Sequence, residues 1–198
     1  MPDSGTAFRF LFLRGVWICM TNILLCGDAA DTSILDALIP ALKFYGGLCY
    51  SGRNAVMQYG TTAEYFLFES DGVPKIGLGK GILLLKDKLN ETMPAPVPDG
   101  FICVLGSRNE QAAHLLCESK ATVVTCGMGS KDTLSLAGLD AAAACVSLQR
   151  NMATLGGKLL EPHDFNVKLL QQRSPEQILA VSAVLLLSGI DSEQEYRI

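Results

Sequence analysis

Short apolar runs alternate with glycine-rich or polar segments along most of the chain. Residues 23–26 (ILLC) form an apolar run closed by Gly27, which is typical of a buried strand. Apolar residues then recur at helical spacing over residues 34–44, and two glycines at 46–47 end the predicted helix. Pro40 lies inside this segment and argues against one unbroken helix.

The same strand, loop and helix pattern continues through the middle of the chain. Apolar runs of strand length occupy residues 48–50, 65–68, 82–85, 101–105 and 121–126. A helix is predicted over residues 109–119, and the proline-rich residues 90–100 read as a connector. This succession predicts an α/β fold with a mostly parallel sheet flanked by helices.

The pattern changes in the C-terminal half. Four short strand-like pieces with turns between them predict a small antiparallel β region, at residues 133–136, 143–148, 158–160 and 165–169. Ser174-Pro175-Glu176-Gln177 has the composition of a capped helix start with proline at the first helical position. A mostly apolar helix over residues 178–187 follows. We expect residues 20–198 to form a single domain.

Residues 1–19 do not fit this plan and are interpreted as a leader outside the fold. Their apolar stretch is broken by Arg14 and Gly15, which is atypical of a signal peptide. A spanning helix needs roughly 20 continuous apolar residues, and this segment has fewer. We expect the natural chain to start near Met20.

Composition narrows the classes of partner. The 198 residues are 49% hydrophobic and 18% charged, as expected when central strands are covered on both faces. A net charge of −4 gives no electrostatic reason for binding a polyanion, so nucleic acid is not an expected partner. A membrane is not expected either.

The seven cysteines are predicted to be reduced core residues of a cytoplasmic protein. They are odd in number and widely spaced, and no C-x-x-C pair occurs. Most lie inside apolar runs, where a thiol behaves as a small buried side chain. With only two histidines, the chain is not expected to hold zinc.

The turn after the first predicted strand is the main candidate site. Gly27, Asp28, Ala29, Ala30, Asp31, Thr32 and Ser33 connect a strand to a helix, which is where backbone N–H groups often bind phosphate. A working phosphate loop places a lysine before its Ser/Thr pair, and here Asp31 precedes Thr32 and Ser33. A carboxylate at that position repels phosphate. The alternative is a helix cap with no nucleotide.

Other candidates are weaker. Glu64, Glu69 and Asp71 are expected to cluster around one strand end, where Glu69 is a possible magnesium ligand. The alternative is an ordinary solvated strand end. The glycine-rich residues 47–54 and 77–81 are interpreted as turns. His163 lies in an acidic turn, and the sequence pairs it with no nucleophile.

Taken together, residues 22–190 resemble the central, ATP-binding domain of the Mur ligase and folylpolyglutamate synthase superfamily. That family has a G-T-N-G-K-T-T loop where residues 27–33 read GDAADTS. Its strand ending in a magnesium-binding glutamate is similar to residues 65–70 (YFLFES). Its "TFG" strand end, antiparallel region and alanine-rich helix are similar to residues 125–127, 133–169 and 180–190. The resemblance implies the family's fold.

The departures from the family pattern concern its chemistry. Asp31 stands at the phosphate-lysine position, and Gly106-Ser107-Arg108-Asn109 replaces the family's adenine-side segment. The stretch for a carbamylated lysine and second metal ligand is missing. The first functional hypothesis is therefore a non-catalytic Mur-ligase-like domain that needs no cofactor and binds a small ligand or a protein partner. Its degenerate phosphate-loop positions are Gly27, Asp31, Thr32 and Ser33.

Two alternatives remain open. In the first, the chain is a nucleotide-dependent ligase fragment that uses Mg-ATP and takes its missing residues from a partner chain. In the second, the chain self-associates into a homo-oligomer with a structural role, as its high apolar content suggests.

Overall fold

A computed structural model describes residues 20–89, 96–117 and 119–198. The predicted leader, residues 1–19, and part of the predicted connector, residues 90–95, lie outside the described residues. Of the helices within the described ranges, none has the length and apolar character that crossing a membrane requires.

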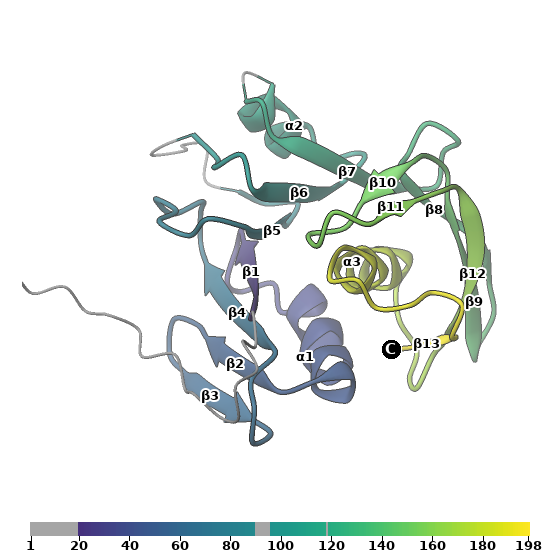
Figure 1. The fold of residues 1–198 in the computed structure, drawn as a ribbon, viewed down its shortest axis with the longest axis horizontal. Coiled ribbons are helices and arrows are strands. Elements are labelled where there is room, and N and C mark those ends of the chain that lie inside the picture. Colours follow the sequence, from purple (N-terminus) through teal and green to yellow (C-terminus); the bar gives the residue numbers. More distant parts are fainter. Residues whose placement is uncertain (1–19, 90–95, 118) are drawn as a thin grey trace, which may run out of the picture.

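Within these ranges, eleven strands form one strongly twisted sheet (Figure 1). Along the sheet they are β13 (Tyr196–Arg197), β12 (His163–Lys168), β9 (Ala143–Leu148), β8 (Leu134–Leu139), β7 (Thr122–Gly127), β6 (Phe101–Gly106), β5 (Gly81–Leu85), β1 (Thr21–Cys26), β4 (Tyr65–Ser70), β2 (Leu48–Ser51) and β3 (Val56–Tyr59). A separate hairpin pairs β10 (Met152–Ala153) with β11 (Leu159–Leu160), and the helices are α1 (Ser33–Tyr45), α2 (Glu110–Leu116) and α3 (Pro175–Leu187).

The sheet is parallel through its centre and antiparallel toward one end. Strands β2, β4, β1, β5, β6, β7 and β8 run parallel to one another. β9 is antiparallel to β8, and β12 is antiparallel to β9. The predicted fold class, a mostly parallel sheet with helices and a small antiparallel region, is confirmed.

The central strands β1 and β5 are buried on both faces. Ile23 and Leu25 point into the larger apolar cluster, which includes α1 and α3. Leu24 and Cys26 point into a second cluster, which includes Ala112 and Leu116 of α2. Side chains alternate between the faces of a strand, so a run without polar residues is needed where both faces are covered.

Helix α1 continues through Pro40 because another side chain compensates for the missing N–H. A proline inside a helix cannot donate to the carbonyl four residues earlier. That carbonyl belongs to Asp36, and it accepts a hydrogen bond of 3.0 Å from Nη2 of Arg173. Arg173 is itself buried and precedes α3, so the bond also joins the two helices.

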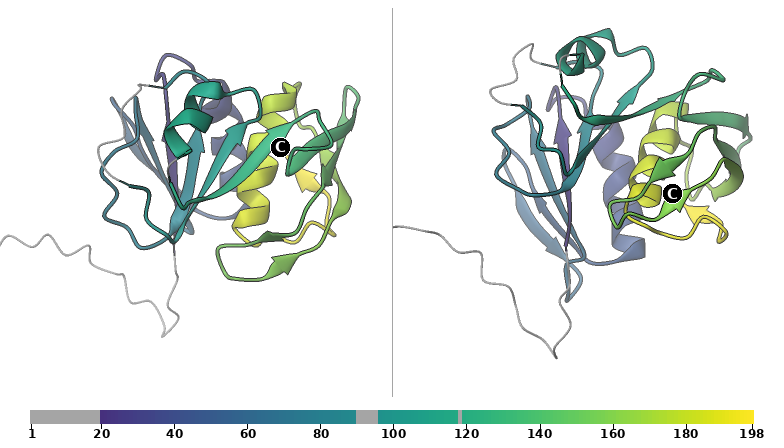
Figure 2. Two further views of the ribbon diagram at one scale, coloured as in Figure 1. Left: turned by 90° about the horizontal axis from the view of Figure 1, so that it is seen from above. Right: turned by 45° about the horizontal axis from the view of Figure 1, so that its top comes forward.

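Helix α3 lies at the centre of the larger core. The sheet curves at its antiparallel end, so β8, β9 and β12 wrap around α3 while α1 lies beside it (Figures 1 and 2). All ten residues from Ile178 to Leu187 are buried, which explains why this helix is apolar on every side. The predicted start is confirmed, with Ser174 and Gln177 forming a capping box and Pro175 following the cap.

The main differences from the predicted elements concern short pieces. Strands β3, β10 and β13 have no strong apolar pattern, and β3 is largely exposed at the sheet edge. Residues 77–81 are not a tight turn between paired strands, because β1 lies between β4 and β5. They belong to a crossover connection, as parallel strands require.

Replacing Ser182 with alanine is expected to stabilise the protein by about 1 kcal/mol. Its hydroxyl in the middle of α3 is fully buried and has no hydrogen-bond partner among the described residues, and an unpartnered buried polar group is costly. Urea unfolding measures the change. Ser188→Ala, at the residue that follows this helix, is the control, because the Ser188 hydroxyl donates to the Val184 carbonyl at 2.7 Å and its loss should destabilise. Equal effects of both substitutions would contradict this reading.

Three buried thiols are expected to stay unreactive in the folded protein and to make it alkali-sensitive. Burial raises the pKa of Cys26, Cys103 and Cys126 from 9.0 to about 12. Their contribution to stability is fully present below about pH 9 and is lost as the pH rises toward 12, since the unfolded thiols ionise first.

Pulse alkylation at pH 8 with mass spectrometry should label exposed Cys117 well before these three. Labelling of all four at one rate in the folded protein would contradict the prediction.

Candidate functional site

The candidate loop after β1 passes so close to β5 that its first residue must be glycine. Gly27 has a φ of +138°, a conformation that L side chains rarely adopt. A Cβ at this position would lie 2.6 Å from Cβ of Lys86 and 2.7 Å from the Lys88 carbonyl oxygen. Gly27 therefore allows the segment after β5 to pack directly against the loop.

The side chain of Lys86 enters the loop and fills it. Lys86 directly follows β5 and is only 1% exposed. Its Nζ donates to the carbonyl oxygens of Asp28 and Asp31, at 3.0 and 2.7 Å. A third bond, of 2.8 Å, goes to Oε1 of Glu69. An ammonium has three N–H donors, so Lys86 is fully satisfied in this position.

Glu69, the predicted metal ligand, lies at the carboxyl end of β4 and has both carboxylate oxygens engaged. Oε1 pairs with Lys86, and Oε2 accepts a 2.8 Å hydrogen bond from the hydroxyl of Tyr50 on β2. Burial and this bond to the carboxylate raise the pKa of Tyr50 to about 12, so the phenol stays protonated. Metal coordination by Glu69 stays a prediction, and it requires displacement of Lys86 first.

The backbone N–H groups of the loop are also largely committed. Gly27 donates to the Ser70 carbonyl and Asp28 to the Lys88 carbonyl, both at 2.9 Å. The carboxylates of Asp28 and Asp31 accept from the N–H groups of Ala30 and Ser33, at 2.9 and 3.0 Å. An anion-binding loop needs N–H groups that point into a free space. In this loop, by contrast, the carbonyl oxygens of Asp28 and Asp31 face inward and bind the ammonium of Lys86.

The remaining predicted loop residues surround the start of α1. Thr32 occupies the cap position, where its hydroxyl donates to the Asp36 carboxylate at 2.8 Å. The hydroxyl and the N–H of Ser33 lower the pKa of Asp31, which keeps that carboxyl ionised. The structure thus gathers all four predicted loop residues at one end of the sheet. Their donor set does not fit the triphosphate of Mg-ATP.

The acidic residues grouped with Glu69 in the sequence are separated by the structure. Asp71 follows β4 and forms an exposed ion pair with Arg53. Glu64 precedes β4, so it lies at the opposite end of the strand, and the expectation of one acidic cluster is wrong. A six-residue strand is about 20 Å long, which keeps the two ends apart.

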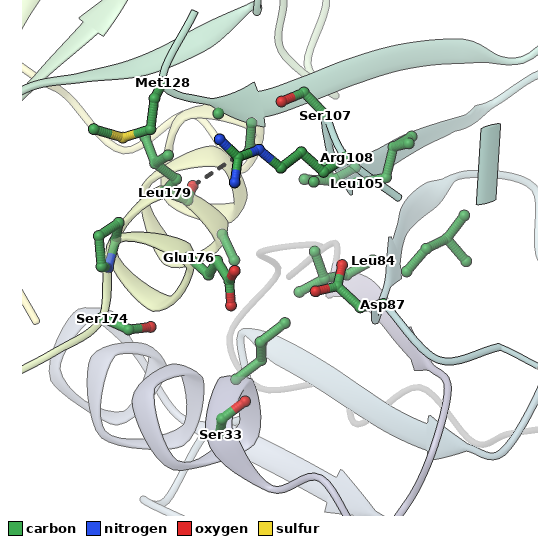
Figure 3. A pocket seen from close by; sticks show the side chains of 18 of the residues that line it. Ser33, Leu84, Asp87, Leu105, Ser107, Arg108, Met128, Ser174, Glu176 and Leu179 are labelled. Atoms are coloured by element: carbon green, nitrogen blue, oxygen red, sulfur yellow. Dashed lines mark hydrogen bonds between the residues drawn. The ribbon is translucent and has the colours of Figure 1, made fainter. Parts of the chain in front are cut away.

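A cavity of about 360 Å³ lies beside the loop, at the carboxyl ends of β5, β6 and β7 (Figure 3). The first residues of α1 and α3 form its other side, where Nε2 of Gln177 donates to the Ser33 carbonyl at 2.6 Å. Ligands of open α/β sheets commonly bind outside the carboxyl ends of the strands. The loop residues Asp31 and Ser33 contribute to this cavity, whereas Lys86 does not line it.

The lining of the cavity combines an apolar floor with charged groups. The floor consists of buried side chains, among them Leu84, Val104, Leu105 and Leu179. Three carboxylates and one guanidinium also line it, from Asp31, Asp87, Glu176 and Arg108. Arg108 belongs to the segment that resembles the family's adenine side, whereas nothing in the sequence indicated Asp87 or Glu176 as site residues, because their elements meet only in the folded chain.

His163 has a partner that the sequence did not indicate. Its Nε2 lies 2.7 Å from the hydroxyl of Ser192, and its Nδ1 lies 2.7 Å from the Glu161 carbonyl oxygen. The carbonyl can only accept, so Nδ1 carries a proton, and in the neutral ring Nε2 then accepts from Ser192. Neither residue lines the cavity at the sheet edge.

Comparison with solved structures identifies the fold. The first match is UDP-N-acetylmuramate:L-alanyl-gamma-D-glutamyl-meso-diaminopimelate ligase from Neisseria meningitides, with a TM-score of 0.57 and 15% identity over 87% of this chain. Two structures of MurF from Acinetobacter baumannii match 88% of this chain with TM-scores of 0.54 and 0.52, at 11% and 13% identity. This chain has a Mur-ligase-like fold.

The Mur-ligase-like chain corresponds to only part of those enzymes. It spans 63% of the Neisseria ligase chain and 44% of each MurF chain. No protein-family model matches the sequence, and a search of curated proteins gives no match. At these identities, the likeness establishes the fold and leaves activity to be argued from the site.

Replacing Lys86 with methionine is expected to destabilise the Mur-ligase-like fold by about 3–5 kcal/mol. The substitution leaves the buried carboxylate of Glu69 and two loop carbonyls without their cation, and breaking a buried pair on one side costs about this much. Urea unfolding measures the loss. Adding Glu69→Gln should recover part of it, because the unpaired charge is then removed.

The matched control for this substitution is Arg53→Met. Arg53 and Asp71 also form an ion pair, but their side chains are 66% and 40% exposed. Exposed pairs contribute about 0–1 kcal/mol, so this variant should remain close to the parent. Similar losses for Lys86→Met and Arg53→Met would show that the buried pair does not hold the loop.

Proposed function

We propose that this chain is a non-catalytic Mur-ligase-like domain that binds a small ligand, or a protein partner, without using ATP. Mur ligases are ATP-dependent ligases, so the proposal separates this chain from its structural neighbours by chemistry and not by fold. One observation carries it: the ammonium of Lys86 occupies the loop where a phosphate loop would hold its nucleotide.

The loop opposes a nucleotide in two ways. Its inward carbonyls and Glu69 already bind the Lys86 ammonium, and moving this cation would leave a buried carboxylate unpaired. Its outward side carries the ionised carboxylate of Asp31 at the position where a phosphate loop has lysine. A triphosphate would therefore meet like charge at the loop and would find few N–H donors there.

The alternative is a ligase fragment completed by a second chain. The partial span relative to the Mur ligases is compatible with it, since a partner would have to supply the missing parts. This alternative also needs a cation near Asp31 and a loop freed from Lys86. It predicts Mg-ATP binding, so one measurement separates the two hypotheses.

We also propose a cytoplasmic location and a function that needs no cofactor. The six cysteines in the described residues are all free thiols, which supports a reducing compartment, and we propose the cytoplasm. No cofactor is required for a domain that only binds. A homo-oligomer is compatible with this function.

Mg-ATP, Mg-ADP and UDP-sugars are expected to leave the melting temperature of the full chain unchanged in a thermal-shift assay. A ligand at 100 times its Kd stabilises the folded state by about 2.7 kcal/mol, which for a chain of this size corresponds to a rise of several degrees. MurF in the same assay is the positive control. A rise of several degrees with Mg-ATP would overturn the proposed function.

The Asp31→Lys variant extends this test. It restores a cation at the phosphate-lysine position but leaves Lys86 bound to the backbone carbonyls of Asp28 and Asp31. The variant is therefore expected to bind no more Mg-ATP than the parent. A gain of binding would show that Asp31 alone blocks the loop and that Lys86 does not.

A further inference from the structure

The cavity beside the loop has the size and lining of a small-molecule site. Its volume of about 360 Å³ is within the range of ligand pockets, about 300–1,000 Å³. The floor is built from side chains at the ends of three parallel strands and from the first turns of α3, with Leu84, Val104 and Leu179 each at most 2% exposed. These side chains form the base, and half-buried Ile34 and exposed Met128 add the apolar surface that a bound group could cover.

Two carboxylates face one another across this cavity. Figure 3 shows the side chains of Asp87, after β5, and Glu176, in the first turn of α3, pointing toward the same central space. Oδ1 of Asp87 lies 3.5 Å from the position of a Cβ on Gly106, so this carboxylate lies against the end of β6. Neither Asp87 nor Glu176 forms an ion pair with any residue in the described ranges.

The balance of charge in the lining is negative. Asp31, Asp87 and Glu176 contribute three carboxylates and Arg108 one guanidinium, which leaves an excess of two negative charges. A concave site with low-dielectric walls concentrates such a field and raises the local concentration of ligands of opposite sign. The same field repels phosphates and carboxylates.

We propose that this cavity binds a small organic cation, with a primary ammonium between Asp87 and Glu176 and an apolar body on the floor. The inference rests on the proposed function, because it names the ligand class of a domain that does not use ATP. A bare metal ion fits less well. No group of three His, Cys, Asp or Glu residues suited to a metal occurs in the described parts of the chain, and an ion would leave the apolar floor uncovered.

Binding of tryptamine to the full chain, measured by calorimetry and by backbone amide NMR shifts, tests the proposal. Tryptophol is the matched neutral probe, since it replaces the amine with a hydroxyl on the same indole body. Tryptamine is expected to bind at least tenfold more tightly than tryptophol, and added salt should weaken it. The shifted amides should include Asp87, Arg108 and Glu176.

The Asp87→Asn/Glu176→Gln double variant is expected to lose at least tenfold in tryptamine affinity while keeping the parent's affinity for tryptophol. Both side chains are exposed at the cavity, so the fold should be retained, and the melting temperature checks this. Glu161→Gln/Glu193→Gln removes the same charge from exposed positions that do not line the cavity, and it should bind tryptamine like the parent.

Three outcomes would overturn the inference: no tryptamine binding, equal affinity for tryptophol, or undiminished affinity in the Asp87/Glu176 variant. Each leaves the proposed function intact if Mg-ATP also fails to bind. Conversely, binding of Mg-ATP overturns the proposed function whether or not tryptamine or tryptophol binds. The two failures are therefore distinguishable on one protein preparation.

Discussion

The buried ammonium of Lys86 holds together three segments that are distant in sequence. It joins the end of β5 to the loop after β1 through two backbone carbonyls, and to β4 through Glu69. Tyr50 extends the chain of bonds to β2. A buried charge is tolerated only when it is fully paired, so the loop cannot rearrange without exposing or orphaning one of these groups. The same bonds that fix the loop therefore also decide what it cannot bind.

The position of α3 turns this fixed loop into one wall of a cavity. The curved antiparallel end of the sheet surrounds the helix, so its capped start is held beside the start of α1. Gln177 serves both as part of the capping box and as the donor to Ser33 across the gap. An apolar floor at this edge follows from the packing of α3 on β5, β6 and β7.

The sequence predicted those elements that depend on interactions between neighbouring residues. The strand and loop predicted at residues 23–33, the capping box at Ser174 and the buried apolar helix after it all follow from the sequence, because each depends on neighbouring residues. Pro40 shows the limit. Its effect on α1 is offset by Arg173, which lies 137 residues after Asp36, and no local pattern connects them.

The loop illustrates the same limit at the candidate site. From the sequence, Asp31 showed that a phosphate lysine is absent, but nothing showed that another lysine fills the loop. Lys86 follows an apolar strand, where a lysine is usually a solvated end, and its carbonyl partners are 55 and 58 residues away. Position 27 must be glycine because a side chain there would collide with Lys86. The sequence alone indicated only the glycine of an ordinary turn.

The loop after β1 joins a strand to a helix as a phosphate loop does, but its polar groups are arranged differently. In a phosphate loop, lysine and N–H groups face the ligand, so the sheet edge attracts anions. Here the lysine faces the protein's own carbonyls, and ionised Asp31 faces the cavity. With the Lys86 ammonium bound inside the loop, the cavity is lined by the carboxylates of Asp31, Asp87 and Glu176 and by one guanidinium, that of Arg108. The proposed preference for a cationic ligand then follows from one internal ion pair, with no change of fold.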